Sequence, residues 1–251
     1  MDRRAYLELN ELEGRHWWFV ARRQILADVL MRRGAIPPHA RILEAGCGCG
    51  GNLDMLGAFG TVSAFEMDDQ ARQIARSRTS VSIAEGQLPD RNPFRGQEFD
   101  LIAMLDVLEH IEDDAGALVE LERCLAPGGQ ILLSVPAYPW LWSGHDEMHH
   151  HHRRYTKRSL VDVLTRAGFE INYITYFNSI LLPLAVGARL MAKHSQGTSL
   201  PGATTNGLLR GIFASERLWL RQGTLPFGLS LLALAGRSAE SGSHVRLKKS
   251  A

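Results

Sequence analysis

The segment from Arg41 to Leu53, RILEAGCGCGGNL, constrains the fold more than any other part of the chain. Ile42 and Leu43 predict a short buried strand, and glycines follow at positions 46, 48, 50 and 51. Glycine lets the backbone adopt positive φ and lets a ligand approach the main chain closely. A helix beginning near Asn52 completes a strand, turn and helix. This combination forms nucleotide sites in parallel α/β sheets.

The glycine spacing fits two cofactor classes, and Glu44 distinguishes them. Gly46-x-Gly48-x-x-Gly51 matches the dinucleotide fingerprint, whereas Gly46-x-Gly48-x-Gly50 fits another class. Glu44 lies two residues before the first glycine, where a carboxylate repels a pyrophosphate and attracts a cationic amino group. A glycine turn without a ligand is the third interpretation, which the entropic cost of so many glycines disfavours.

The segment resembles the first motif of the class I S-adenosylmethionine (SAM)-dependent methyltransferases, Glu/Asp-x-Gly-x-Gly-x-Gly. The resemblance implies that Glu44 lies at the methionine end of SAM. Cys49 stands where that family most often has Thr or Ser, a difference of little weight if the loop uses only its backbone. The cofactor residues that we predict in this loop are Gly46, Cys47, Gly48, Gly50 and Asn52.

A second carboxylate follows a predicted strand at Thr61–Glu66. Glu66 lies 20 residues after Gly46, the spacing at which an acidic side chain binds both ribose hydroxyls. In the resembled family this residue binds the SAM ribose, and the next residue, here Met67, packs on adenine. The loop after a third strand, predicted at 80–84, implies adenine-edge contacts from Gln87 and Leu88, although the family's usual aspartate is missing there.

The predicted fourth strand, Phe99–Leu105, runs into Asp106-Val-Leu-Glu-His110. A Glu-His pair after this strand is common in one large subset of the resembled methyltransferases. We include Leu105 in the cofactor set. His110 is either a general base, because unperturbed imidazole titrates near pH ~6.5, or a structural residue that orients the loop. We favour the structural role and keep His110 as a catalytic candidate.

Residues 136–155 follow a predicted fifth strand at 130–135 and hold aromatic residues, a His-Asp pair, four consecutive histidines and two arginines. They lie at the carboxyl edge, where open α/β sheets bind ligands. We predict that Asp146 orients His145 as a general base, and that Arg153 and Arg154 bind an anionic acceptor. Alternatively, the arginines are a solvated lead-in to the next helix and the histidines merely fill the loop.

No metal site is predicted, because adjacent histidines in a loop cannot all face one ion and no outlying ligand motif is present. Cys47-x-Cys49 also lacks a second cysteine pair. The elements His16-Trp-Trp-Phe19 and His151-x-Arg-Arg-Tyr155 resemble those of a little-characterised methyltransferase subfamily.

The predicted fold is α/β: a doubly wound, Rossmann-like sheet of seven strands, mostly parallel, with an antiparallel last strand. Residues 1–40 form a helical lid whose aromatic residues either cap the sheet or, through Trp18, close over the cofactor. The methyltransferase domain spans 41–236. It contains a helical insert at about 179–222, between strands at 170–177 and 225–234. Residues 237–251 are predicted to be a disordered tail.

The chain has 251 residues and a formal net charge of +1. This length fits one large α/β domain, and the charge gives no reason to expect a nucleic-acid partner. The apolar runs are too short to span a membrane, the first residues lack the apolar core of a signal peptide, and three cysteines make no disulfide framework. We therefore expect a cytoplasmic protein that could contact a membrane peripherally.

These features predict methyl transfer from SAM to a small-molecule or lipid-linked acceptor. The apolar helix predicted at 179–193 is either core or the wall of a pocket for a hydrophobic acceptor. Two alternatives remain at this point: a nicotinamide-dinucleotide oxidoreductase or epimerase, and a SAM-binding module without catalytic activity.

Overall fold

The structure is a computed structural model that describes residues 10–183, 187 and 200–238. The helices and strands that it defines, with two short 3₁₀ turns labelled η, are α2 (Trp17–Arg33), β1 (Ala40–Ala45), α3 (Leu53–Gly57), β2 (Gly60–Glu66), α4 (Asp69–Arg78), β3 (Ser82–Glu85), β4 (Phe99–Leu105), η1 (Leu108–His110), α5 (Asp114–Glu122), β5 (Leu125–Pro136), η2 (Pro139–Leu141), α6 (Gly144–Met148), α7 (Lys157–Arg166), β6 (Phe169–Phe177), α9 (Ala203–Leu220) and β7 (Ser230–Arg237).

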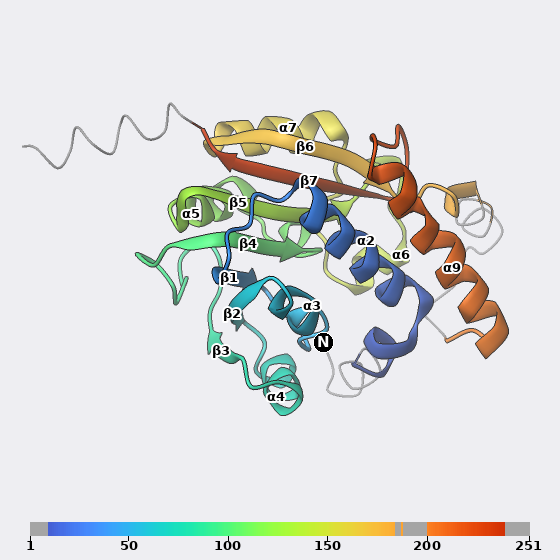
Figure 1. Cartoon of the computed structure of the whole chain (residues 1–251), viewed down its shortest axis with the longest axis horizontal. Helices are drawn as coiled ribbons and strands as arrows, with labels where there is room; N and C mark the ends of the chain where they lie inside the picture. The colour runs from blue at the N-terminus through green and yellow to red at the C-terminus, as the bar shows by residue number, and fades with distance from the viewer. Residues whose placement is uncertain (1–9, 184–186, 188–199, 239–251) are drawn as a thin grey trace, which may run out of the picture.

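The strands form one seven-stranded sheet in the order β3-β2-β1-β4-β5-β7-β6 (Figure 1). Neighbours from β3 to β5 run parallel, whereas β7 pairs antiparallel with both β5 and β6. The strand order reverses between β1 and β4, and ligands of open α/β sheets bind beyond the carboxyl ends of strands at such a point. The predicted fold class, including the antiparallel last strand, is confirmed.

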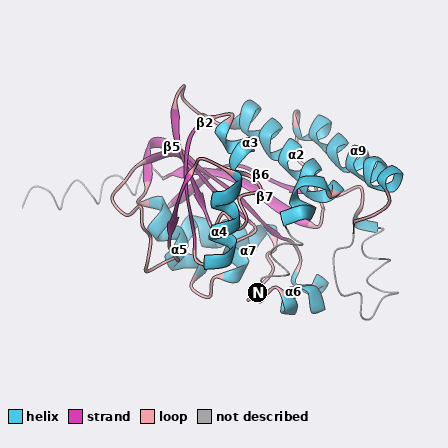
Figure 2. Cartoon of the chain, turned by 90° about the horizontal axis from the view of Figure 1, so that it is seen from below, coloured by secondary structure: helices cyan, strands magenta, loops and turns pink. Residues whose placement is uncertain are grey.

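Helices cover both faces of the sheet, which explains why β1 and β4 are buried along almost their whole length. One face packs against α2, α3, α4 and α9, and the other packs against α5 and α7. Figure 2 shows α2, α3 and α9 on the opposite side of the sheet from α5 and α7.

Local sequence signals explain where several helices begin. The Asp68 carboxylate accepts hydrogen bonds from the backbone N–H groups of Gln70 and Ala71, and thereby caps α4. Thr156 and Ser159 form a reciprocal capping box at the start of α7. These caps place two helix starts at the edge of the sheet that carries the candidate site.

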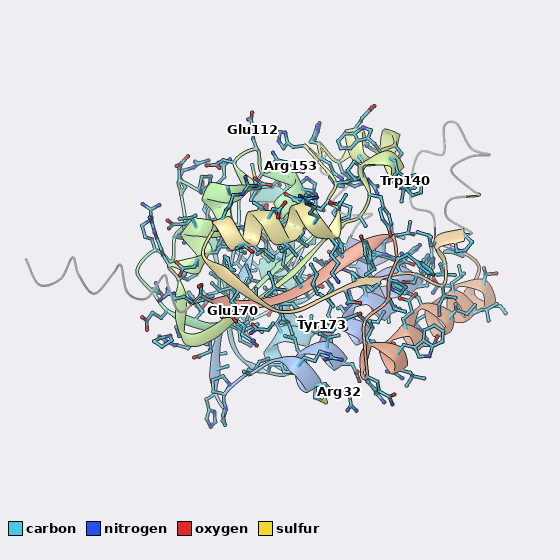
Figure 3. All side chains as sticks on the ribbon, turned by 90° about the horizontal axis from the view of Figure 1, so that it is seen from above. Arg32, Glu112, Trp140, Arg153, Glu170 and Tyr173 are labelled. Carbon is cyan, nitrogen blue, oxygen red and sulfur yellow. The ribbon has the colours of Figure 1, made fainter. Side chains whose placement is uncertain are left out.

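The N-terminal helix α2 is paired with α9, which lies almost two hundred residues later in the chain. The Trp17 backbone N–H donates to Asn206 Oδ1 (2.8 Å), and Arg221 binds Asp28 through Nη2 (2.7 Å). The Arg33 guanidinium lies 4.2 Å from the ring centroid of Tyr173 on β6, which is labelled in Figure 3. The first helix is therefore held in place by the last third of the described chain.

Three predicted boundaries differ from the structure. The last strand begins at Ser230 rather than 225, because Leu225 forms an isolated bridge with Tyr176 before the chain turns. The third strand begins at Ser82 rather than 80. The fifth strand begins at Leu125 rather than 130, so Pro127, Gly128 and Gly129 form an irregularity within β5.

Most of the apolar helix predicted at 179–193, and all but the first two residues of the predicted tail at 237–251, lie outside the described residues. The later part of the helical insert predicted at about 179–222 forms α9. Within the described part of the chain, none of the helices has both the length and the apolar character needed to cross a membrane.

Candidate active site

The glycine loop between β1 and α3 is held by its own backbone. The N–H groups of Gly46 and Cys47 both donate to the carbonyl of Phe65 at the end of β2 (3.0 and 3.1 Å). Gly46 has a φ of +76°, and a Cβ there would lie 2.8 Å from a methyl group of Val107. Gly48 has a φ of +53°, and a Cβ there would meet no atom within 4 Å. The loop therefore needs glycine at 46 for packing and leaves open space above 48.

Glu44, at the end of β1, is a buried carboxylate that is only partly satisfied. Its Oε1 accepts a hydrogen bond from Asn52 Nδ2 (2.8 Å), whereas its Oε2 has no hydrogen-bond partner among the described residues. The residue is 1% exposed, and burial raises the pKa of its carboxyl to about 8, although the Asn52 bond and the Arg22 charge act in the other direction. A cationic ligand group would stabilise the charged form.

Glu66, at the end of β2, holds the other side of the loop. Its two carboxylate oxygens accept hydrogen bonds from the N–H groups of Gly48 and Asp68 (2.9 Å each). The adjacent Met67 side chain is 61% exposed. Met67 lines a hollow of about 130 Å³ together with Glu85, Gly86 and Arg91. A carboxylate and an exposed apolar side chain therefore lie next to each other, as the ribose and adenine assignments require.

Two of the predicted cofactor side chains face the core. Leu88 and Leu105 are 6% exposed and pack in opposite core clusters. Their side chains are therefore not available at the surface of the site, and any contribution would come from their backbone. Gln87 forms a bridge with Arg91 and accepts a hydrogen bond from that guanidinium, which places it beside the hollow.

Arg22 on α2 is a residue that we did not predict as part of the site. Its guanidinium is buried, forms an ion pair with Asp106 and donates to Ser134 Oγ (3.1 Å). It also donates to Asn52 Oδ1 (3.4 Å), and its Nε has no hydrogen-bond partner among the described residues. In the sequence, the feature that could have indicated Arg22 is its position four residues after Trp18, which places both on the same side of the helix.

The two N-terminal tryptophans have different surroundings. Trp17 packs edge-on against Phe213 of α9, at 5.9 Å between ring centroids. Trp18 lies under the Arg22 guanidinium, at 5.2 Å from the ring centroid. Glu13, from the helical residues 10–15, lies over Gly51 and binds Arg78 (2.8 Å). Trp17 therefore packs against α9 and the core. Closure over the cofactor by Trp18 stays a prediction.

Asp146 is saturated with partners, and this corrects its predicted role. Its oxygens accept bonds from His151 Nδ1 (2.9 Å), from Arg154 Nε and Nη2 (2.7 and 3.0 Å) and from Ser143. Burial alone would raise the pKa of Asp146, but these bonds outweigh burial and hold the pKa below its usual range. Asp146 therefore orients an imidazole, as expected, but that imidazole belongs to His151. For the predicted base His145, only the backbone position in α6 is described.

The two arginines are also occupied. Arg154 is 8% exposed and, besides the Asp146 pair, donates to the carbonyl of Ala137 (3.2 Å). Arg153 binds Asp114 (2.8 Å) and donates to the carbonyl of Glu112 (2.6 Å), and Figure 3 shows Arg153 and Glu112 close together. Both guanidinium groups thus fix the loop to the protein. The prediction that they bind an anionic acceptor loses its structural basis.

The histidine segment lies against the turn that follows β4. The His152 N–H donates to the carbonyl of Glu109 (2.8 Å), and the His110 and His151 rings meet edge to face with centroids 4.5 Å apart. His110 is exposed at its edge, but desolvation by the surrounding protein, followed by the nearby His151 and His149, lowers its pKa to about 4, so that its imidazole is neutral at pH 7. Glu109 is 1% exposed, and burial, followed by the charge of Asp106, raises its pKa well above the usual value.

Comparison with known proteins identifies the family. A sequence model of the methyltransferase domain matches residues 18–174, which is more than half of the chain. The chain belongs to the methyltransferase domain family. This methyltransferase is 30% identical over 160 residues to a "Probable S-adenosylmethionine-dependent methyltransferase" of Mycolicibacterium smegmatis, a match that covers 62% of the chain and 60% of that relative.

Two further proteins extend the comparison. A "Ubiquinone biosynthesis O-methyltransferase" of Thiobacillus denitrificans is 32% identical over 102 residues, which cover 38% of the methyltransferase and 44% of the relative. One chain from the solved complex of the Haloferax volcanii Trm112 methyltransferase activator with a methyltransferase aligns with a TM-score of 0.62 at 18% identity. That alignment covers 93% of this chain and 95% of the other, and it supports the fold alone.

The methyltransferase therefore uses SAM, and its own residues fit this cofactor. Glu44 Oε2, which has no hydrogen-bond partner in the described part of the chain, and the open space above Gly48 are features that a bound ligand with a cationic group would complete. Bound SAM supplies a methyl group that its sulfonium already activates. The chain's task is to bind, orient and exclude water, because alignment of donor and acceptor lowers the barrier without covalent catalysis.

Proposed function

We propose that this methyltransferase acts on a hydroxyl group of a small-molecule or lipid-linked acceptor. The observation that carries the proposal is the pairing of His151 with Asp146 beside His110, in the segments that follow β4 and β5. An imidazole whose Nδ1 is held by a carboxylate can accept the proton that a hydroxyl loses on methylation. The name of the Thiobacillus relative, an O-methyltransferase, supports oxygen as the nucleophile.

The surface next to the histidines supports an acceptor with an apolar part. Trp140, Trp142 and Met148 are 67%, 40% and 46% exposed, and Trp140 is labelled in Figure 3. A single exposed apolar side chain is ordinary, but several in one segment beside the histidines suit a hydrophobic ligand. Both nearby arginines have carboxylate partners, which removes the reason to require an anionic acceptor.

The cofactor roles follow from the same geometry. Glu44 would bind the amino group of SAM and Arg22 its carboxylate, because Asn52 contacts both side chains and each has one polar atom without a hydrogen-bond partner among the described residues. Glu66 would bind the ribose hydroxyls and Met67 the adenine. We expect Glu66→Ala to weaken SAM binding by about 1.5–3 kcal/mol, the range for hydrogen bonds to a charged group. Calorimetry measures this loss. The control is Glu170→Ala, an exposed carboxylate on β6 at the opposite edge of the sheet, which should leave the affinity unchanged.

Transfer of labelled methyl groups tests the acceptor proposal. The assay compares phenols with and without an alkyl tail, and matched amines, and we expect the tailed phenol to accept the label fastest. His151→Phe should lower turnover at least tenfold while SAM affinity stays within about twofold. His150→Asn, in an exposed neighbour with positive φ, should have no effect. Labelled amines with unlabelled phenols would refute oxygen as the nucleophile.

A further inference from the structure

The turn after β4 and the histidine segment bring three metal-binding groups to one place. Glu109, His110 and His151 each offer a ligand atom, and these atoms lie within 4.8 Å of one another. Ligand atoms around a tetrahedral zinc ion at about 2.0–2.1 Å are separated by roughly 3.4 Å. Side-chain movements of about an ångström would therefore close the site around an ion.

The Glu109 carboxylate gives an independent reason to expect a cation. The side chain is 1% exposed, and its Oε2 has no hydrogen-bond partner among the described residues. A buried carboxylate oxygen without a hydrogen-bond partner is destabilising. Asp106, the charge that adds most to this cost, is itself paired with Arg22. A cation between Glu109 and the imidazoles would supply the missing partner.

The His151 imidazole is held in the tautomer that a metal ligand needs. Asp146 is kept ionised by Arg154 and accepts a bond from His151, so Nδ1 carries the proton and Nε2 carries the lone pair. A carboxylate behind a histidine ligand fixes the ring and makes the ligand nitrogen more basic. The backbone adds to this orientation, because the His151 N–H donates to the Asp146 carbonyl (2.9 Å).

We propose that Glu109, His110 and His151 bind a divalent transition-metal ion of the zinc class, with Asp146 as the orienting carboxylate behind His151. Two imidazoles with one carboxylate match zinc sites that keep an open position for water or substrate, whereas Mg²⁺ prefers oxygen ligands. The mixture of a buried carboxylate, a half-buried ring and an exposed ring leaves that open position toward solvent.

The site is not one that the sequence pattern alone could indicate. Adjacent histidines do not face one ion here either, since the three ligands come from two segments about forty residues apart. If the proposed acceptor hydroxyl binds at the open position, the ion would lower the pKa of that hydroxyl. The ion would then replace the His151 imidazole in promoting loss of the hydroxyl proton, because the Nε2 lone pair would be bound to the metal. This consequence rests on the proposed function, whereas metal binding itself does not.

Metal titration of the tag-free chain, stripped with a chelator, tests the proposal without any acceptor. We expect one Zn²⁺ per chain with an affinity in the micromolar range or tighter, and Co²⁺ should give the visible absorption of a site with nitrogen ligands. Glu109→Gln, His110→Asn and His151→Phe should each weaken Zn²⁺ binding at least tenfold. His110 is exposed, so His110→Asn tests the site even if a buried variant fails to fold.

Two controls separate this site from other histidines in the run. Glu147→Gln and His150→Asn change exposed neighbours and should leave Zn²⁺ binding within twofold. Calorimetry with SAM on the same samples checks that each variant still binds the cofactor, independently of the metal. Absence of Zn²⁺ binding in the wild type, equal binding in all variants, or a preference for Mg²⁺ would each overturn the proposal.

Discussion

The glycine loop and the histidine segment both contain buried carboxylates, but the carboxylates differ in how many partners they have. Glu44 is one partner short and its pKa is raised to about 8. Asp146, equally buried, has five hydrogen bonds and a lowered pKa. The contrast shows that burial alone does not mark a ligand site. A buried carboxylate with an oxygen that lacks a hydrogen-bond partner can bind a cationic group. One whose oxygens all accept hydrogen bonds stabilises the fold instead.

Removal of Asp146 tests the structural side of this comparison and should have the largest effect. Asp146→Ala leaves the Arg154 guanidinium buried and unpaired, so we expect a loss of about 3–5 kcal/mol in the free energy of unfolding. Urea denaturation measures it. As a control, Asp162→Ala removes the exposed partner of Arg158 and should barely change stability. Similar losses of unfolding free energy in both variants would mean that the buried ion pair contributes no more to stability than the exposed one.

Neutralisation of Glu44 tests whether the carboxylate with an unpaired oxygen binds the cofactor. Glu44→Gln keeps an oxygen that can accept from Asn52 but removes the charge that would meet the amino group of SAM. We expect SAM affinity to fall by about 1.5–3 kcal/mol, while adenosine, which lacks that amino group, binds almost as before. Calorimetry with both ligands gives the answer. Equal losses for SAM and adenosine would contradict the assignment of Glu44.

The raised pKa of Glu44 predicts how the stability of the ligand-free protein depends on pH. Between the ordinary carboxyl value of 4.5 and about 8, the unfolded chain loses the Glu44 proton while the folded protein keeps it. The contribution of Glu44 to stability is therefore greatest at low pH and is lost as pH rises, by at most about 1.4 kcal/mol per pH unit. Relative to wild type, Glu44→Gln should gain stability toward pH 8. Urea unfolding of both proteins at several pH values tests this, and a constant difference would refute it.

The smallest expected effect concerns the aromatic residues beside the loop. SAM should change the intrinsic fluorescence, and the change should shrink in Trp18→Phe, because Trp18 lies under Arg22 at the cofactor side. Trp17→Phe is the matched control, since Trp17 packs on Phe213 and should retain the full signal. The same signal in both variants would leave Trp18 as a packing residue.

The comparison also explains what the sequence could predict. Glu44, Gly48 and Glu66 lie at strand ends, and their contacts follow from the order of elements along the chain. The partners of Asp146 depend on how the histidine segment lies against the turn after β4, and adjacency in sequence pointed to His145 without revealing the bond from His151. Arg22 was missed for a related reason, because its contacts reach Ser134, 112 positions away. A local pattern carries no information about such contacts.

The pairing of α2 with α9 has a consequence for how the chain is made. Trp17 and Asp28 bind Asn206 and Arg221, which a ribosome adds roughly 190 residues later. Until then, the apolar side of the first helix has no partner from α9, and the Arg22 charge cannot reach Ser134 before β5 exists. During synthesis, α2 therefore stays without α9 while the intervening residues are added, and in that interval its apolar side is open to aggregation and to chaperones.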